Sequence, residues 1–171
     1  LRPTLDALPV KYYKNRTKTL FSSAYLPSFG LADKINALEP DVVHLHWVAD
    51  GMLRIEDISK IKAPIVWSLH DMWAFTGGCH YDEECEGYKN HCGNCKVLGS
   101  EKKNDLSAKI FQRKIKVFSN TSNLTIVGLS RWMTQAARQS SLFKNIPIVN
   151  LPNSIDTEKF SPLAKSVARD L

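Results

Sequence analysis

No long apolar run occurs in this sequence of 171 residues. A helix that crosses a bilayer needs roughly 20 consecutive apolar residues, so these residues are expected to contain no transmembrane helix. Internal repeats and low-complexity tracts are also absent, which argues against a repeat protein. The glycine-rich dinucleotide fingerprint, the P-loop and the nucleophile elbow are missing too. Their absence counts against a dinucleotide-dependent dehydrogenase, an NTPase and an α/β-hydrolase.

The overall composition is that of an ordinary globular domain. Hydrophobic residues make up 43% of the sequence and charged residues 23%, both near the usual values. The length suits one domain with a substantial core. The first residue is Leu1 rather than Met, and the last segment has the character of a linker. We therefore expect a fragment of a longer protein, and the lack of a leader segment carries no weight.

Positive charge is concentrated in one segment, 87–116, which we name the basic stretch. Its basic residues are Lys89, Lys96, Lys102, Lys103, Lys109, Arg113, Lys114 and Lys116. Only Glu101 and Asp105 offset them, so the segment alone accounts for the net charge of +6. Such a stretch favours anionic lipid, nucleic acid or phosphorylated substrates, and a solvated helix face is the alternative. Tyr12 and Tyr13, set among basic residues, suggest a second membrane or nucleic-acid contact, or else a surface loop.

Four short apolar segments predict β-strands. They lie at 41–47, 64–70, 124–129 and 147–151. Apolar residues at helical spacing predict helices at 31–38, 51–61 and 105–118. Ser130 is a fitting N-cap for a further helix at 131–140. Because a strand, a helix and a strand in close succession form a βαβ unit, the strands are expected to be parallel. The predicted fold class is α/β: a Rossmann-like, open, mostly parallel sheet with helices on both faces and a cysteine-rich insertion at 74–103. A further short strand is predicted at 19–25.

Polar residues follow the ends of all four predicted strands. They are His46, His70, Asp71, Ser130, Arg131 and Asn153. Ligands of open parallel sheets bind beyond the carboxyl ends of the strands, so these residues are candidates for binding a sugar, a nucleotide or a phosphate. Gly77 and Gly78 follow the second strand and would let backbone approach a ligand closely. His70 and Asp71 are the candidate catalytic residues, with the alternative that His70 only caps its strand by hydrogen bonding.

All four cysteines fall within the insertion. The cysteine cluster, as we name it, consists of Cys79, Cys85, Cys92 and Cys95. Its spacing is C-x5-C-x6-C-x2-C, and the final two-residue gap lets both thiolates meet one tetrahedral ion. The insertion has few apolar residues and cannot form a hydrophobic core of its own, so a structural zinc ion would stabilise its fold. His80 and His91 are possible substitute ligands. Two disulfides in an oxidising compartment, or free thiols, are the alternatives.

Several segments resemble one protein family. The runs PDVVHLHW, PIVWSLHDMWAFTGGCHY, CEGYKNHCGNC, LTIVGLSRWM and PNSIDTEKFSP are similar to those of retaining glycosyltransferases of the GT-B, family 4 class. The resemblance covers residues 20–162 and is greatest to the bacterial subgroup that builds extracellular or capsular polysaccharide. It implies an N-terminal Rossmann-like acceptor domain at 1–152, and an interdomain linker with the start of a C-terminal domain at 153–171. The family's histidine at the end of an N-domain strand corresponds to His70, and its implied role is to contact the acceptor or the sugar and help hold developing charge.

The resemblance also implies partners. The acceptor would be a glycan or a lipid-linked molecule. The nucleotide-sugar donor would bind mainly to the C-terminal domain, which this chain lacks together with the family's first glycine-rich loop. The chain alone is therefore expected to be inactive, and to lie in the cytoplasm with peripheral contact to the inner face of the cytoplasmic membrane. A zinc-containing nucleic-acid-binding module and a non-catalytic carbohydrate-binding protein are the alternatives. Nucleic acid is not an expected partner, because the basic residues fall largely on one amphipathic helix without a base-reading motif.

Overall fold

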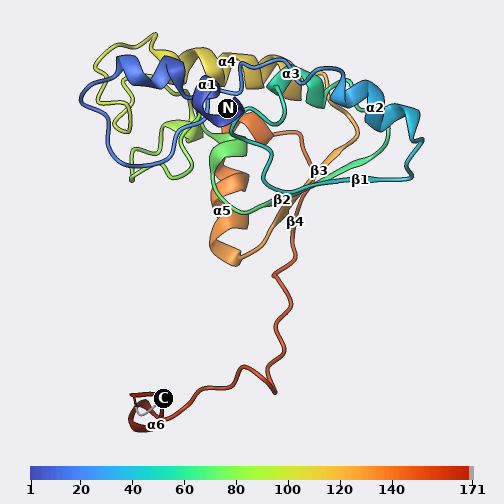
Figure 1. Cartoon of the computed structure of the whole chain (residues 1–171), viewed down its shortest axis with the longest axis vertical. Coiled ribbons are helices and arrows are strands. Elements are labelled where there is room, and N and C mark those ends of the chain that lie inside the picture. The colour runs from blue at the N-terminus through green and yellow to red at the C-terminus, as the bar shows by residue number, and fades with distance from the viewer. Residues whose placement is uncertain (170–171) are drawn as a thin grey trace.

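The centre of the computed structural model, which describes residues 1–169, is a four-stranded sheet (Figure 1). Its strands are β1 (Val43–Leu45), β2 (Ile65–Leu69), β3 (Leu124–Gly128) and β4 (Ile148–Asn150). They lie in the order β1-β2-β3-β4, and every neighbouring pair is parallel. The predicted α/β class and the parallel sheet are confirmed.

Helices flank this sheet. They are α1 (Arg2–Asp6), α2 (Leu31–Ala37), α3 (Ile55–Ile58), α4 (Leu106–Phe118) and α5 (Arg131–Gln139), with short 3-10 helices η1 (Leu8–Tyr12), η2 (Trp73–Phe75), η3 (Gly87–Lys89) and η4 (Ser141–Phe143). A further helix, α6 (Lys165–Arg169), lies away from the sheet near the end of the chain (Figure 1). Figure 1 shows α2, α3 and α4 together on one side of the sheet, and α5 packs against β3 and β4. None of these helices is long and apolar enough to cross a membrane.

An aromatic and aliphatic core joins the sheet to α4. The Trp67 ring of β2 packs edge-on against Phe118 of α4, with 6.5 Å between ring centres. On the same helix Ile110 and Phe111 are fully buried, and each such side chain stabilises the fold by about 1.5–3 kcal/mol relative to an exposed one. Asp105 caps the helix by accepting a hydrogen bond from the Ala108 amide. The core therefore fixes the carboxyl end of β2, where the candidate catalytic residues follow.

The crossover helix between β1 and β2 is shorter than predicted. A helix was expected at 51–61, but α3 begins at Ile55 and ends at Ile58. Asp50 and Gly51 have left-handed backbone, with φ of 52° and 74°, and Arg54 is extended. A regular helix cannot pass through such residues, so the chain turns first and becomes helical only afterwards.

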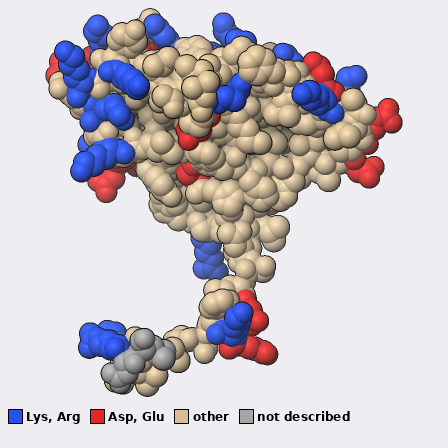
Figure 2. Space-filling view, viewed as in Figure 1, with Lys and Arg blue, Asp and Glu red and all other residues tan. Residues whose placement is uncertain are grey.

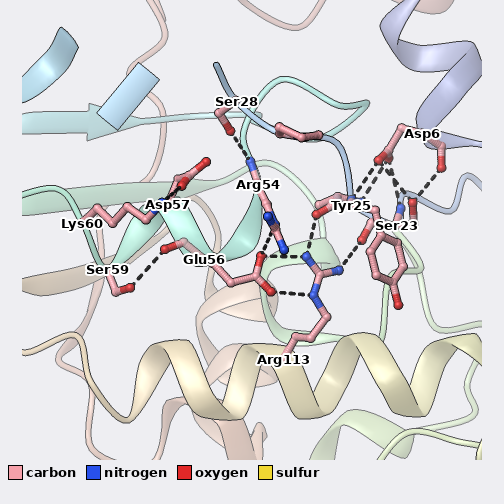
Figure 3. Close-up of polar contacts among 12 residues, drawn as sticks. Asp6, Ser23, Tyr25, Ser28, Arg54, Glu56, Asp57, Ser59, Lys60 and Arg113 are labelled. Atoms are coloured by element: carbon pink, nitrogen blue, oxygen red, sulfur yellow. Dashed lines mark hydrogen bonds and ion pairs between the residues drawn. The ribbon is translucent and has the colours of Figure 1, made fainter. Parts of the chain in front are cut away.

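The strand predicted at 19–25 is wrong. Only Phe21 pairs with another segment, in a single antiparallel bridge to Cys79. The backbone amides of residues 23–25 donate instead to the carboxylate of Asp6, which is buried at the end of α1 (Figure 3). Since a buried amide must find an acceptor, this carboxylate takes the place of a neighbouring strand.

The chain after β4 is exposed. Every described residue from 151 to 169, α6 included, is exposed, and Figure 1 shows this segment running away from the sheet. The predicted domain boundary at 152 lies at the start of this segment and stays a prediction.

Candidate active site

Two histidines meet beyond the carboxyl ends of β1 and β2. The two strands are parallel neighbours with Leu45 opposite Trp67, so the residues that follow emerge at one edge of the sheet. Nδ1 of His46 lies 2.9 Å from Nε2 of His70, and both side chains are exposed. The Trp67 indole N–H donates to the His46 carbonyl at 2.8 Å, which fixes the end of β1. The predicted proximity of these two histidines is therefore observed, and the second nitrogen of each ring faces no hydrogen-bond partner within residues 1–169.

Asp71 directs its carboxylate toward the protein rather than toward solvent. Its Oδ1 accepts from the Trp73 amide at 2.8 Å. Its Oδ2 accepts from the Trp47 indole N–H at 2.9 Å and lies 2.6 Å from Nδ1 of His80. Burial raises the pKa of Asp71, but these hydrogen bonds and the attraction of His80 outweigh burial and leave the pKa below its ordinary value. The carboxylate is therefore ionised at neutral pH.

His80 extends this polar network into the interior. Its side chain is buried, and Nε2 lies 2.9 Å from Oγ of Ser22, whose hydroxyl donates to Oδ1 of Asp50 at 2.9 Å. Sequence reasoning named His80 only as a substitute zinc ligand and missed Ser22 and Asp50. No local pattern marks these two residues, because Ser22 comes from a segment 58 residues before His80.

A buried lysine supports the turn that carries Asp71. Lys114 of α4 is fully buried, and its ammonium group donates to the carbonyls of Trp73 and Thr76, the latter at 3.0 Å. It also lies 4.0 Å from the centre of the Trp73 ring, a favourable cation–π contact. Burial lowers the pKa of Lys114 to about 7. The contacts tie η2 to α4, directly after the candidate catalytic residues.

The two predicted glycines pack against the protein itself. Gly77 and Gly78 are buried. A Cβ on Gly77 would lie 2.6 Å from the Ser107 carbonyl oxygen, and one on Gly78 would lie 2.7 Å from the Phe21 ring. Gly78 also has a φ of 122°, which side-chain-bearing residues rarely adopt. These glycines thus permit a close approach between segments of the chain itself, and their predicted contact with a ligand stays a prediction.

The other predicted binding residues are not in contact with the histidine pair. Ser130 caps α5 as predicted, because its Oγ accepts from the Met133 amide at 3.0 Å. Arg131 is exposed and lines a separate depression beside α5 together with Asn150. Asn153 lies in the exposed segment after β4. Their role in substrate binding stays a prediction.

The cysteine cluster is largely buried, with only Cys85 exposed, and all four residues are free thiols. Burial raises the pKa of every one of them, to about 12 for Cys92, and the neighbouring thiols raise that of Cys79 further by like-charge repulsion. No group of three or more His, Cys, Asp or Glu side chains in residues 1–169 has an arrangement that could hold a metal ion. As placed, the thiols therefore do not form a zinc site, and zinc binding stays a prediction.

A groove lies where part of the basic stretch meets the segment that contains Tyr12 and Tyr13. It has a volume of about 1240 Å³, and Tyr12, Tyr13, Lys14, Lys102 and Lys109 are among the residues that line it. Figure 2 shows lysine and arginine side chains gathered at the left end of the molecule, where Figure 1 draws the start of the chain and the cysteine-rich insertion. Lys102 and Lys109 of the basic stretch thus lie on one surface with Tyr12 and Tyr13, whereas Lys114 is buried and Arg113 pairs with Glu56.

A curated protein of Escherichia coli (strain K12), named "Putative colanic acid biosynthesis glycosyl transferase WcaC", is 33% identical to this chain over 70 residues. The match covers 36% of this chain, and the chain spans 17% of the length of this relative. No protein-family model matches the chain, and no solved structure matches it. The similarity relates this chain to a glycosyltransferase.

Proposed function

We propose that the chain is the acceptor-side domain of a retaining glycosyltransferase of the GT-B, family 4 class. The similarity to a glycosyl transferase, the parallel Rossmann-like sheet and the H-D-M-W and N-x-I-D-x-x-x-F-x-P segments support the proposal. The reaction would transfer a sugar from a nucleotide-sugar to a glycan or a lipid-linked acceptor in polysaccharide biosynthesis. The nucleotide-sugar would bind to a second domain in the complete protein.

The observation that carries the proposal is the contact between His46 and His70 at the strand ends. In this site His70 is the residue that touches the reacting sugar or the acceptor hydroxyl. His46 engages Nε2 of His70 at 2.9 Å, which orients the ring and leaves Nδ1 for the substrate. An imidazole in this position can accept a proton from a hydroxyl or donate a hydrogen bond to a group that gains negative charge.

Asp71 acts differently in this proposal. Both of its oxygens already accept hydrogen bonds from the protein, and Trp47, Trp73 and His80 are the partners. An oxygen so engaged is a poor base for a substrate proton. We therefore infer that Asp71 is a positioning residue, which fixes the backbone after His70 and the Trp47 side chain.

The test uses the complete protein that contains this chain. It is incubated with UDP- and GDP-linked sugars and with candidate saccharide acceptors, and release of nucleoside diphosphate is measured. We expect release that depends on both a particular donor and a saccharide acceptor. Saccharide binding with no release from any donor would instead identify a non-catalytic carbohydrate-binding protein and contradict the proposal.

A further inference from the structure

We propose that the indole ring of Trp47 is the platform on which a sugar ring of the acceptor stacks, an inference that rests on the proposed function. Trp47 directly follows His46, and its side chain is 41% exposed. The face of an indole ring carries negative charge density. It therefore attracts the weakly positive C–H groups on one face of a pyranose ring. Trp47 lines the same shallow depression as His46 and His70, so its partly exposed ring lies near the histidine pair.

The polar edge of the indole is fixed by the protein. Its Nε1–H donates to Oδ2 of Asp71 at 2.9 Å, and the same nitrogen lies 3.3 Å from Nδ1 of His80. The ring centres of Trp47 and His80 are 5.7 Å apart. The other nitrogen of the His80 ring, Nε2, is in hydrogen-bond contact with Oγ of Ser22. A side chain that is fixed before the ligand arrives loses little conformational entropy on binding, so this network pre-organises the platform.

The shape of the surface suits stacking rather than enclosure. The depression lined by His46, Trp47, His70 and Asp71, among other residues, has a volume of about 10 Å³. That is scarcely room for one water molecule, so a sugar ring cannot enter it. The ring would lie over the exposed indole, and its hydroxyl groups would reach the free nitrogens of the histidine pair. This arrangement assigns the apolar face of the sugar to Trp47 and its polar edge to the histidines.

Two substitutions separate the aromatic face from the hydrogen bond. Trp47→Phe keeps an aromatic ring but loses the N–H that Asp71 accepts, whereas Trp47→Leu loses both. Phe29→Leu is the matched control, because Phe29 is an aromatic residue that is 76% exposed and has no part in the site. Thermal unfolding of each variant verifies that the fold is retained.

Binding of lactose, maltose and cellobiose to the complete protein is measured in every variant by NMR saturation transfer to the sugar, and the indole N–H signal of Trp47 is followed in the unaltered protein. We expect Trp47→Leu to weaken binding about tenfold, the effect of losing about 1.4 kcal/mol of ring contact. Trp47→Phe should weaken it less than about threefold on the same scale, and Phe29→Leu should leave it unchanged.

The outcomes distinguish this inference from the proposed function. Sugar binding that is unchanged in Trp47→Leu would overturn the platform while leaving the glycosyltransferase assignment intact. Equal losses in Trp47→Phe and Trp47→Leu would also overturn it, because the hydrogen bond rather than the ring would then carry the effect. If none of the three sugars binds the unaltered protein, both the platform and the acceptor site fail.

Discussion

Replacing Glu56 by Gln should reduce the loss of folding stability that we expect in acid. Glu56 of α3 forms two contacts with Arg113 of α4, at 2.7 Å to Nε and 2.8 Å to Nη2 (Figure 3). Arg113 also donates to the carbonyls of Ser23 and Ala24 and lies over the Tyr25 ring. The ion pair therefore connects α3 and α4 to residues 23–25. These residues directly follow Ser22, which contacts His80 in the polar network of the site.

The magnitude follows from the titration of Glu56. Burial raises its pKa, but the hydrogen bond and positive charge of Arg113, with a smaller contribution from Arg54, outweigh burial and lower the pKa from 4.5 to about 2. Because the folded pKa lies below the unfolded one, the carboxylate stabilises the fold above pH 4.5, and this stabilisation is lost as the pH falls toward 2. The shift corresponds to about 3.4 kcal/mol. The side chain is 34% exposed, so solvent screening reduces the expected contribution to about 1–2 kcal/mol.

Urea unfolding followed by tryptophan fluorescence at pH 7 and pH 3 measures this contribution. With the folded pKa at about 2, roughly 60% of the contribution is lost by pH 3, so the unaltered protein should lose about 1 kcal/mol more than the Glu56→Gln variant between the two conditions. Glu39→Gln is the control, because Glu39 is exposed and has no ion pair within residues 1–169. It should behave as the unaltered protein does. If Glu56→Gln and Glu39→Gln lose stability equally in acid, the Glu56–Arg113 pair does not contribute as argued.

Three further predictions concern other parts of the molecule. If the cysteine cluster binds zinc, elemental analysis of protein purified without chelator should find about one zinc per chain; absence of metal together with two oxidised pairs would favour disulfides. If the basic stretch and the tyrosine pair meet anionic lipid, binding to phosphatidylglycerol vesicles should fall steeply with added salt, and equal binding to neutral vesicles would exclude an electrostatic contact. Gly78→Ala should destabilise the fold by about 1–3 kcal/mol through backbone strain, whereas Gly87→Ala, whose added Cβ would meet nothing closer than 3.8 Å, should have little effect; equal stability of the two variants would contradict the packing role of Gly78.

Most of the sheet could be predicted because each strand is a short apolar run with a polar residue at its end. The same pattern placed His46 and His70 at one edge, since parallel neighbours end together. Helices α2, α4 and α5 were predicted within one residue at either end, because apolar residues recur at helical spacing in the first two and Ser130 is a recognisable N-cap for the third. These features depend on residues that are near one another in the sequence.

The features that were missed depend on contacts between distant residues. The strand predicted at 19–25 fails because Asp6 takes its amides, and no spacing rule links a carboxylate to amides 17 or more residues away. The hydrogen bonds of Asp71 could not be predicted, because its partners Trp47 and His80 lie on other segments. The packing of α4 and Phe21 against Gly77 and Gly78 could not be predicted either, because these segments are distant in the sequence.

The most direct test of the central claim is the rate of sugar transfer by His70→Asn in the complete protein. His91→Asn is the control, because His91 is likewise exposed but lies in the cysteine-rich insertion, where its Nε2 contacts Gln112. If His70 touches the reacting groups, His70→Asn should keep its stability within about 1 kcal/mol and lose roughly a hundredfold in turnover, while His91→Asn keeps most of its activity. A His70→Asn variant that folds and transfers sugar at an unchanged rate would contradict the catalytic assignment of the histidine pair.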